Sequence, residues 1–412
     1  MRIGILGAGI SGLALGKMLN ASSDVELLER NDFSGGIAHA AMIGDIPYHQ
    51  AGGHCLNSSL PGVMDFVFGS VLPKNSWHKI QRISSILFHG HYIPYPIEQS
   101  IPQIADFDEK LAINIVEDFF GTLPDRASSA RTLDEWLKKT FGAKLAEEYF
   151  IPYNKKVWNT DLSQMSPAWT TGKLPIPDRN IFFRSLLGKK NCNVPHAAFF
   201  YPKKNSQNAF IDALASGLRI TYNYPVLSAE KKENHWDING EKTFDVLVST
   251  LPLDIMPAII PMNSWEAAPF NRLKRNGIKT VLYKTQPRKD TWTYFPDQDL
   301  AFHRVVSIGN FLRPTIPYAI VESTGGYSFE QIRGHAKKID FLLEPVAENY
   351  SEYAYPVFDK DVEKNKKAAL RVLSSKGVHA LGRFAEWEYY NMDVCIYRAM
   401  QVAAAILKQC SC

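Results

Sequence analysis

Four residues near the start of the chain have the types and the spacing needed to bind a dinucleotide. Gly7, Gly9 and Gly12 form the pattern Gly-x-Gly-x-x-Gly, and Glu29 lies 17 residues beyond Gly12. In such a pattern the first glycine makes a tight turn, the second lets a pyrophosphate approach the backbone, and the third allows close helix packing. A carboxylate at Glu29 suits a ribose 2′-hydroxyl and would repel a phosphate there. The spacing therefore predicts a dinucleotide site.

A strand, a turn and a helix are needed to position these residues, and the surrounding sequence predicts all three. Residues 3–6 form a short apolar strand, residues 13–19 continue as an apolar helix, and residues 25–28 form a second strand that ends at Glu29. The helix in a β-α-β unit presents unpaired N–H groups and its positive dipole end to the phosphates. A glycine turn without a ligand explains these elements less well than a dinucleotide site does.

A second glycine pair extends the motif. Gly35 and Gly36 lie in the segment 31–36, shortly after Glu29. The segment resembles the extended motif of flavoproteins, in which this loop runs along the diphosphate of FAD. The resemblance favours FAD over NAD as the cofactor.

The composition indicates a globular chain and excludes several classes of protein. The 412 residues are 45% hydrophobic and 21% charged, and the net charge of +4 is spread without a large basic cluster, so we expect no nucleic-acid partner. The five cysteines have no spacing that fits zinc. We therefore expect no metal site and a cytoplasmic location. No apolar stretch approaches the roughly 20 residues that span a bilayer, and the residues before the first strand lead us to expect no export signal.

Helical and strand signals alternate along the rest of the chain. The predicted helices lie at 106–150, 361–374 and 392–408. The predicted strands lie at 83–88 and 92–97, as a hairpin, and at 218–222, 226–231, 246–250 and 378–381, and several strands of mixed pattern fill about 280–322. The pair Asn239-Gly240 predicts a two-residue hairpin turn.

Several segments, spread over most of the chain, resemble a known family. Residues 219–226 and 244–252 look like the part of amine-oxidase and protoporphyrinogen-oxidase type flavoproteins that returns to the nucleotide-binding sheet. Within that group, the chain resembles UDP-galactopyranose mutase in four segments: 48–54 with its Gly-His pair, 153–158, the Tyr355-Pro356 pair, and 382–393. The segment 382–393 is the strongest match.

The resemblance implies a role for individual residues. Cofactor-binding residues would be Gly7, Gly9, Ser11, Gly12, Glu29, Arg30, Gly35, Gly36, Val226, Arg383, Asn391 and Met392, with Val226 beside the adenine and the last helix beginning at the flavin pyrimidine. Substrate-binding residues would be Tyr153 on the nucleobase, Trp158 closing over the substrate, and Tyr355, Tyr389 and Arg304 on the diphosphate. Catalytic residues would be Arg304 and His54, the latter beside the isoalloxazine. Independently of the family, a guanidinium fork and tyrosine hydroxyls suit a diphosphate.

Some of these residues also have purely structural alternatives. Tyr153 and Trp158 could be core aromatic residues at the end of a helix. Arg304 could be a surface or ion-paired residue, and His54 could be a core histidine with satisfied hydrogen bonds.

The chain departs from the family pattern at three places, one of which is the segment 201–208, which lacks the glycines usual in the family loop. Pro177 stands where the family has its second phosphate-binding arginine, and Arg179 or Lys173 are candidates to replace that arginine. Asn391 stands where bacterial members usually carry Asp. The preference for galactose is therefore open.

We predict an α/β fold with a Rossmann-like FAD-binding domain, a helical insertion and an antiparallel β-sheet domain. The FAD-binding domain would comprise 1–78, 198–260 and 345–412, the helical substrate-binding insertion 98–197, and the sheet domain 79–97 and 261–344. The active site would lie where the three parts meet, since pockets favour domain junctions.

The function implied by the resemblance is the interconversion of pyranose and furanose forms of a nucleotide-diphosphate sugar. It involves no net redox and uses N5 of the reduced flavin as nucleophile. NAD(P)H would be the candidate reductant, and a homo-oligomer is compatible with the sequence. The alternatives are a FAD-dependent oxidoreductase of the amine-oxidase or protoporphyrinogen-oxidase type, and a protein whose flavin is structural and whose cleft binds a partner.

Overall fold

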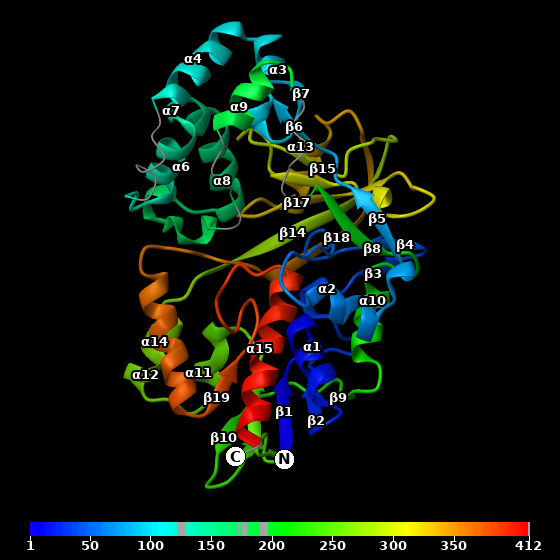
Figure 1. The fold of residues 1–412 in the computed structure, drawn as a ribbon, viewed down its shortest axis with the longest axis vertical. Helices are drawn as coiled ribbons and strands as arrows, with labels where there is room; N and C mark the ends of the chain where they lie inside the picture. Colours follow the sequence, from blue (N-terminus) through cyan, green and yellow to red (C-terminus); the bar gives the residue numbers. More distant parts are fainter. Residues whose placement is uncertain (122–128, 172–173, 175–178, 190–196, 411–412) are drawn as a thin grey trace.

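The computed structural model describes residues 1–121, 129–171, 174, 179–189 and 197–410. It contains a parallel sheet flanked by helices, a large sheet composed mainly of antiparallel strands, and a helical region beside the large sheet (Figure 1). This arrangement confirms the predicted α/β fold class.

Five parallel strands form the smaller of these sheets, in the order β19-β13-β1-β2-β9. Their bounds are β1 Arg2–Leu6, β2 Asp24–Leu28, β9 Arg219–Thr221, β13 Val246–Ser249 and β19 Val378–Ala380. Consecutive residues of β1 are buried, so both faces of the sheet are covered. Ile3 and Ile5 pack with the helices on one face, and Leu6 packs on the other with Phe244.

The first helix and the last helix lie side by side against this sheet (Figure 1). They are α1 Ile10–Leu19 and α15 Met392–Cys410; the other helices of this region are α2 Val63–Phe66, α10 Asn208–Ala215, α11 Met256–Ile259, α12 Ser264–Asn271 and α14 Val362–Ser375. The predicted β-α-β unit and the helices predicted near residues 361 and 392 are thus confirmed. A three-stranded sheet of β10 Ala229–Lys231, β11 Trp236–Ile238 and β12 Lys242–Phe244 is attached, and Asn239 and Gly240 make its turn with positive φ angles of 56° and 72°.

The large sheet has seven strands in the order β18-β14-β17-β16-β15-β6-β7. Their bounds are β6 Ser84–Phe88, β7 His91–Pro94, β14 Arg275–Thr285, β15 Trp292–Tyr294, β16 Arg304–Val306, β17 Tyr318–Ser323 and β18 Leu342–Pro356. β6 and β7 confirm the predicted hairpin. Neighbouring strands are antiparallel except β15 and β6, which are parallel.

The edge strand β18 gave no strand signal in the sequence. It pairs with β14 from Leu342 to Pro356, whereas the sequence analysis grouped residues 345–356 with the nucleotide-binding domain. Most of its side chains are polar or exposed, so it lacks the hydrophobic alternation by which strands are recognised.

Helices on one side of the large sheet form the third region (Figure 1). They are α3 Ile101–Ala105, α4 Glu109–Phe120, α6 Leu133–Phe141, α7 Ala143–Leu145, α8 Ile151–Trp158 and α9 Arg179–Leu186. Outside this region, the structure also has the helix α13 Phe329–Ala336 and two small two-stranded sheets. These sheets are β3 Ala41–Ile43 with β4 Ile46–Tyr48, and β5 Trp77–Gln81 with β8 Ala198–Pro202. Asp108 caps α4 by accepting a hydrogen bond from the Leu111 N–H at 2.9 Å. In the described part of the chain, we find no helix with the length and apolarity required to cross a bilayer.

Candidate active site

The glycine-rich turn after β1 has a geometry that requires glycine. Gly7 has a positive φ of 96°, which disfavours any side chain. A Cβ on Gly12 would lie 2.1 Å from the carbonyl oxygen of Gly7, so α1 can approach the strand only without it. The roles predicted for the first and third glycines therefore have a direct steric basis.

Gly9 faces open space instead. A Cβ placed there would meet no heavy atom closer than Gly36 Cα at 4.0 Å, and Gly9 is paired as an isolated bridge with Gly35. Both Gly35 and Gly36 have positive φ, of 106° and 55°. The two glycine segments thus lie side by side and leave room for a ligand at the N-terminus of α1.

Glu29 is buried at the end of β2. Its Oε2 accepts a hydrogen bond from the Ala8 N–H at 2.9 Å, and its Oε1 accepts from the backbone and side-chain nitrogens of Asn31, both at 3.0 Å. These bonds fix the carboxylate against the glycine turn, and the residue remains part of the cavity wall.

A cavity of about 1040 Å³ begins at this turn and extends to the large sheet. It is lined by eleven of the twelve predicted cofactor residues, namely Gly7, Gly9, Ser11, Glu29, Arg30, Gly35, Gly36, Val226, Arg383, Asn391 and Met392, and also by His54, Arg304, Tyr355 and Tyr389. The twelfth, Gly12, packs α1 against the turn. The residues present fit a dinucleotide such as FAD, because the open face of Gly9, the helix N-terminus and the Glu29 carboxylate lie on one wall of this space.

Arg304 lies at the opposite end of the cavity, on β16. The register of β16 and β17 places it directly opposite Glu322, and its Nε donates a hydrogen bond to Glu322 Oε2 at 2.8 Å. The other oxygen of Glu322 accepts from the Gly53 N–H at 2.9 Å. Although burial opposes the charge, Glu322 raises the pKa of Arg304. The guanidinium is therefore charged and held in a fixed orientation.

Tyr355, Tyr389 and Arg383 form a second group on the cavity wall. The guanidinium carbon of Arg383 lies 4.6 Å from the ring centre of Tyr389 and 5.3 Å from that of Tyr355, and its Nη1 donates to the carbonyl of Tyr390 at 3.0 Å. Burial raises the pKa of Tyr355, so its hydroxyl stays protonated and can donate a hydrogen bond.

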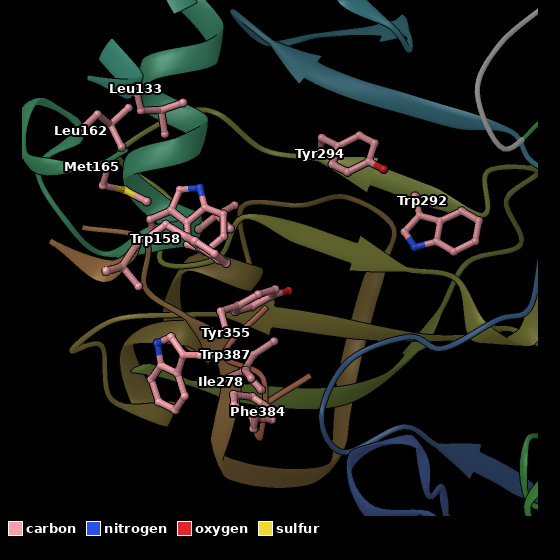
Figure 2. Packing of buried hydrophobic residues seen from close by; sticks show 14 of the residues in the cluster. Leu133, Trp158, Leu162, Met165, Ile278, Trp292, Tyr294, Tyr355, Phe384 and Trp387 are labelled. Atoms are coloured by element: carbon pink, nitrogen blue, oxygen red, sulfur yellow. The ribbon is translucent and has the colours of Figure 1, made fainter. Parts of the chain in front are cut away.

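Trp158 and Tyr153 lie behind this group, not on the cavity wall. Trp158 is 1% exposed and packs edge-on against Tyr355 and Tyr389, with ring centres 5.9 and 5.8 Å apart. Figure 2 shows it beside Leu133, Leu162 and Met165, all from the helical region. Tyr153 contacts Tyr294 edge-on at 5.7 Å. Both residues have the core environment of their structural alternative, and both touch residues that line the cavity.

His54 lines the cavity and is held in a neutral form. Burial, followed by the charge of Arg383, lowers its pKa to about 4. Its backbone N–H donates to His49 Nδ1 at 3.2 Å, while the other nitrogen of His49 bonds the Tyr201 hydroxyl at 2.8 Å. His54 Nδ1 is buried and has no hydrogen-bond partner among the described residues.

Three residues of the site were not predicted from the sequence. Glu322 is the partner of Arg304, and Arg82 and Tyr294 line the same cavity. Only the register of β16 and β17 would have revealed Glu322, and an arginine just before a strand gives no signal of a site. Pro177 and Lys173 lie outside the described residues, and Arg179, at the start of α9, is not part of the cavity wall.

Comparisons with known proteins agree with this fold. The profile of the NAD(P)-binding Rossmann-like domain matches residues 5–67. The UDP-galactopyranose mutase of Mycoplasma genitalium is 21% identical, and the alignment covers 98% of this chain and 94% of that protein.

Three solved structures have the same overall arrangement. A reduced UDP-galactopyranose mutase superposes with a TM-score of 0.85 at 20% identity, covering 99% of this chain and 94% of the other. A putative protoporphyrinogen oxidase from Exiguobacterium sp. 255-15 has a TM-score of 0.74 at 16% identity, and a CLA-producing fatty acid isomerase from P. acnes has 0.70 at 15%; each alignment covers 98% of both chains. The resemblance predicted from the sequence is confirmed, and the chain has the fold of UDP-galactopyranose mutase.

Proposed function

We propose that the protein interconverts the pyranose and furanose forms of a nucleotide-diphosphate sugar, with FAD as its cofactor. The continuity of the cavity carries the proposal: one space is lined at one end by the glycine turn and at the other by Arg304, Tyr355 and Tyr389. A dinucleotide and an anionic substrate can therefore meet inside it. The names of the mutase relatives support a nucleotide sugar as the substrate.

The residues of the large sheet and of the segment before α15 bind the diphosphate in this proposal. Arg304 offers a charged fork of donors whose orientation is fixed by Glu322. Tyr355 and Tyr389 add neutral donors, which hold the diphosphate oxygens when the bond to the anomeric carbon breaks. Substrate and product are isomers, so no electrons are gained or lost overall.

When bound and reduced, FAD would supply a nucleophilic nitrogen, N5, for this reaction. NAD(P)H is the proposed reductant. His54 is neutral near pH 7, so it acts by hydrogen bonding and not as a charged acid. Arg383 and the N-terminus of α15 place positive charge beside the position expected for the flavin.

The experiment is a product assay on the purified holoprotein. Dithionite reduces the flavin under argon, candidate UDP- and dTDP-sugars are added, and chromatography separates pyranose from furanose products. We expect a furanose product from at least one sugar, and loss of most of this activity in Arg304→Gln.

A FAD-dependent oxidoreductase is the alternative function, because the structure of a putative protoporphyrinogen oxidase has a similar fold. An oxidoreductase of that type, or of the amine-oxidase type, would consume oxygen with an amine or an apolar ring substrate. A panel in which no sugar is isomerised while such a substrate is oxidised would replace our proposal with this alternative.

A further inference from the structure

Arg82 is a cavity-lining arginine that the proposed site has not used. It lies just before β6, and Tyr294, on the neighbouring strand β15, is the residue that pairs in register with Arg304 of β16. Both Arg82 and Tyr294 line the same cavity as Arg304. Tyr294 and Arg304 therefore come from adjacent strands of one sheet, Arg82 comes from the segment just before a third strand, and all three residues line one space.

The guanidinium of Arg82 is held in place by neutral groups. Its Nη2 donates a hydrogen bond to the Tyr294 hydroxyl, and its Nε donates to Ser84 Oγ at 3.0 Å. Its carbon lies 5.3 Å from the ring centre of Tyr95 and 5.1 Å from that of Trp292, which places it between aromatic faces. Figure 2 shows Trp292 and Tyr294 on the same strand.

The charge of Arg82 is not balanced by the protein in the part of the chain that the structure describes. Arg304 is paired there with Glu322, and Arg275, another lining residue, with Asp254 and Glu352. No carboxylate lies within 4.0 Å of Arg82 among the same described residues. A half-buried cation without a carboxylate partner is costly unless an anion binds there.

Cys55 shows that Arg82 and Arg304 act on one region of the cavity. Burial raises the pKa of this thiol to about 12, and the charges of Arg82 and Arg304 both oppose that increase. Cys55 itself lines the cavity. Both guanidiniums therefore lie near enough to Cys55 to act on its thiol, and one of them, Arg304, is already paired with Glu322.

We propose that Arg82, oriented by Tyr294, is the second guanidinium that binds the diphosphate of the substrate. The inference rests on the proposed function and deepens it. A diphosphate carries two negative charges, and the positive charge of Arg304 is already neutralised by Glu322, so a second cation is needed to bind it. The sequence has Pro177 at the position where the family resemblance places a second arginine. Arg82 supplies a planar fork from the segment just before β6, and the Tyr294 hydroxyl, which accepts a hydrogen bond from Arg82, can still donate one of its own.

The test measures binding of UDP and of inorganic pyrophosphate to the FAD-loaded protein by calorimetry. We expect Arg82→Gln to weaken UDP binding by about 10- to 100-fold, the usual effect of losing a charge-assisted hydrogen bond. Arg82→Lys should recover part of the loss, and Tyr294→Phe should cause a smaller loss. The control is Arg371→Gln, which removes the same charge from an exposed position on α14 outside the cavity wall.

Flavin absorbance and melting temperature identify any variant that fails to fold. If Arg82→Gln does not fold, the milder variants Arg82→Lys and Tyr294→Phe still test the role of Arg82. Wild-type affinity for UDP in all three folded variants would overturn the role of Arg82 while leaving the proposed function intact. A loss seen only with sugars that carry a carboxylate, and not with UDP or pyrophosphate, would also overturn it. A wild-type protein that binds neither UDP nor any UDP-sugar would refute the proposed function itself.

Discussion

Arg304 and Glu322 face each other across two antiparallel strands and form a hydrogen-bonded ion pair at the end of the cavity. Glu322 is fully buried, and its second oxygen holds the Gly53 N–H at 2.9 Å. A single carboxylate therefore connects the large sheet with the loop that carries His54. The pair fixes the guanidinium that we assign to the diphosphate.

Glu322→Ala should destabilise the fold strongly. Removing one partner of a buried pair leaves the other charge uncompensated, which typically costs about 3–5 kcal/mol. Urea denaturation measures this loss in the free energy of unfolding. The control is Glu348→Ala, because the partly exposed pair of Glu348 with Arg333 should contribute less than about 1 kcal/mol. Equal losses in the two variants would show that Glu322 is not a structural anchor.

Gly9→Ala should prevent FAD binding without destabilising the protein in its FAD-free form. Its φ of −73° is ordinary, and a Cβ would meet no atom closer than 4.0 Å, so unfolding should change by less than about 1 kcal/mol. The added methyl group would instead occupy the space needed for the pyrophosphate. We expect colourless protein with normal denaturation behaviour, measured by visible absorbance and urea titration.

The matched control is Gly334→Ala, at a glycine in α13 with open space around it. It should keep its flavin and gain slightly in stability, since alanine favours a helix. Full FAD binding by Gly9→Ala would contradict the placement of the diphosphate at this turn.

The glycine turn was predictable because its chemistry is local in sequence. Gly7, Gly12 and Glu29 act through the strand, turn and helix that immediately surround them, and these elements carry their own hydrophobic pattern. The partner of Arg304 was not predictable, since Glu322 meets it only through the register of two strands. Arg82 is similar: its neighbour Tyr294 is 212 residues away, and nothing near Arg82 marks it.

The edge strand β18 was missed for a different reason. Its hydrogen bonds to β14 stabilise it while only four of its fifteen residues are buried, so its sequence carries little hydrophobic pattern. Backbone pairing at a sheet edge depends on the strand beside it, which a reading of local periodicity does not include.

Trp158→Ala should lower both stability and substrate affinity. The indole is fully enclosed, its Nε1 donates to Asn154 at 3.1 Å, and it supports the rings of Tyr355 and Tyr389. Removing a buried tryptophan typically costs about 3–5 kcal/mol. UDP binding should weaken because both tyrosines lose their packing. Trp265→Ala, at an indole that is 72% exposed, should change neither property.

Trp158→Phe separates the two effects. A folded Trp158→Phe protein with wild-type affinity for UDP would show that an aromatic ring at this position supports the tyrosines without closing over the substrate itself. A large loss of affinity at normal stability would instead show that the indole moves onto the substrate.

Glu98 should make stability depend on pH. Burial raises its pKa from 4.5 to about 7, and it lies near the buried hydroxyls of Tyr95 and Tyr149. The folded chain therefore keeps a proton that the unfolded chain releases above pH 4.5. This contribution is fully present below pH 4.5, is lost as the pH rises to about 7, and amounts to about 3 kcal/mol.

Glu98→Gln isolates this effect, because glutamine mimics the protonated acid at every pH. Urea denaturation of both proteins at pH 5 and pH 8 should show that the gain in stability of the variant over the wild type is much larger at the higher pH. Other groups titrate equally in both proteins, so their contributions cancel in the difference. The same difference at both pH values would mean that Glu98 titrates at its ordinary pKa.

His54 should stay neutral throughout the physiological range, and Arg383 should be part of the reason. Burial is the larger cause of its lowered pKa of about 4, and the charge of Arg383 is the next. Arg383→Gln should therefore raise the pKa of His54 while leaving it below 6.5, because burial persists. NMR titration of histidine-labelled protein without FAD measures both values.

This prediction constrains the reaction as well. A neutral His54 at pH 5–8 cannot supply a charged acid, so the activity profile over that range should contain no step from this residue. Arg313→Gln serves as the control, since that exposed arginine is not among the groups that lower the pKa of His54. A wild-type pKa near 6.5 would return His54 to the list of acid–base candidates, and it would also show that the loop held by Glu322 exposes the imidazole to solvent.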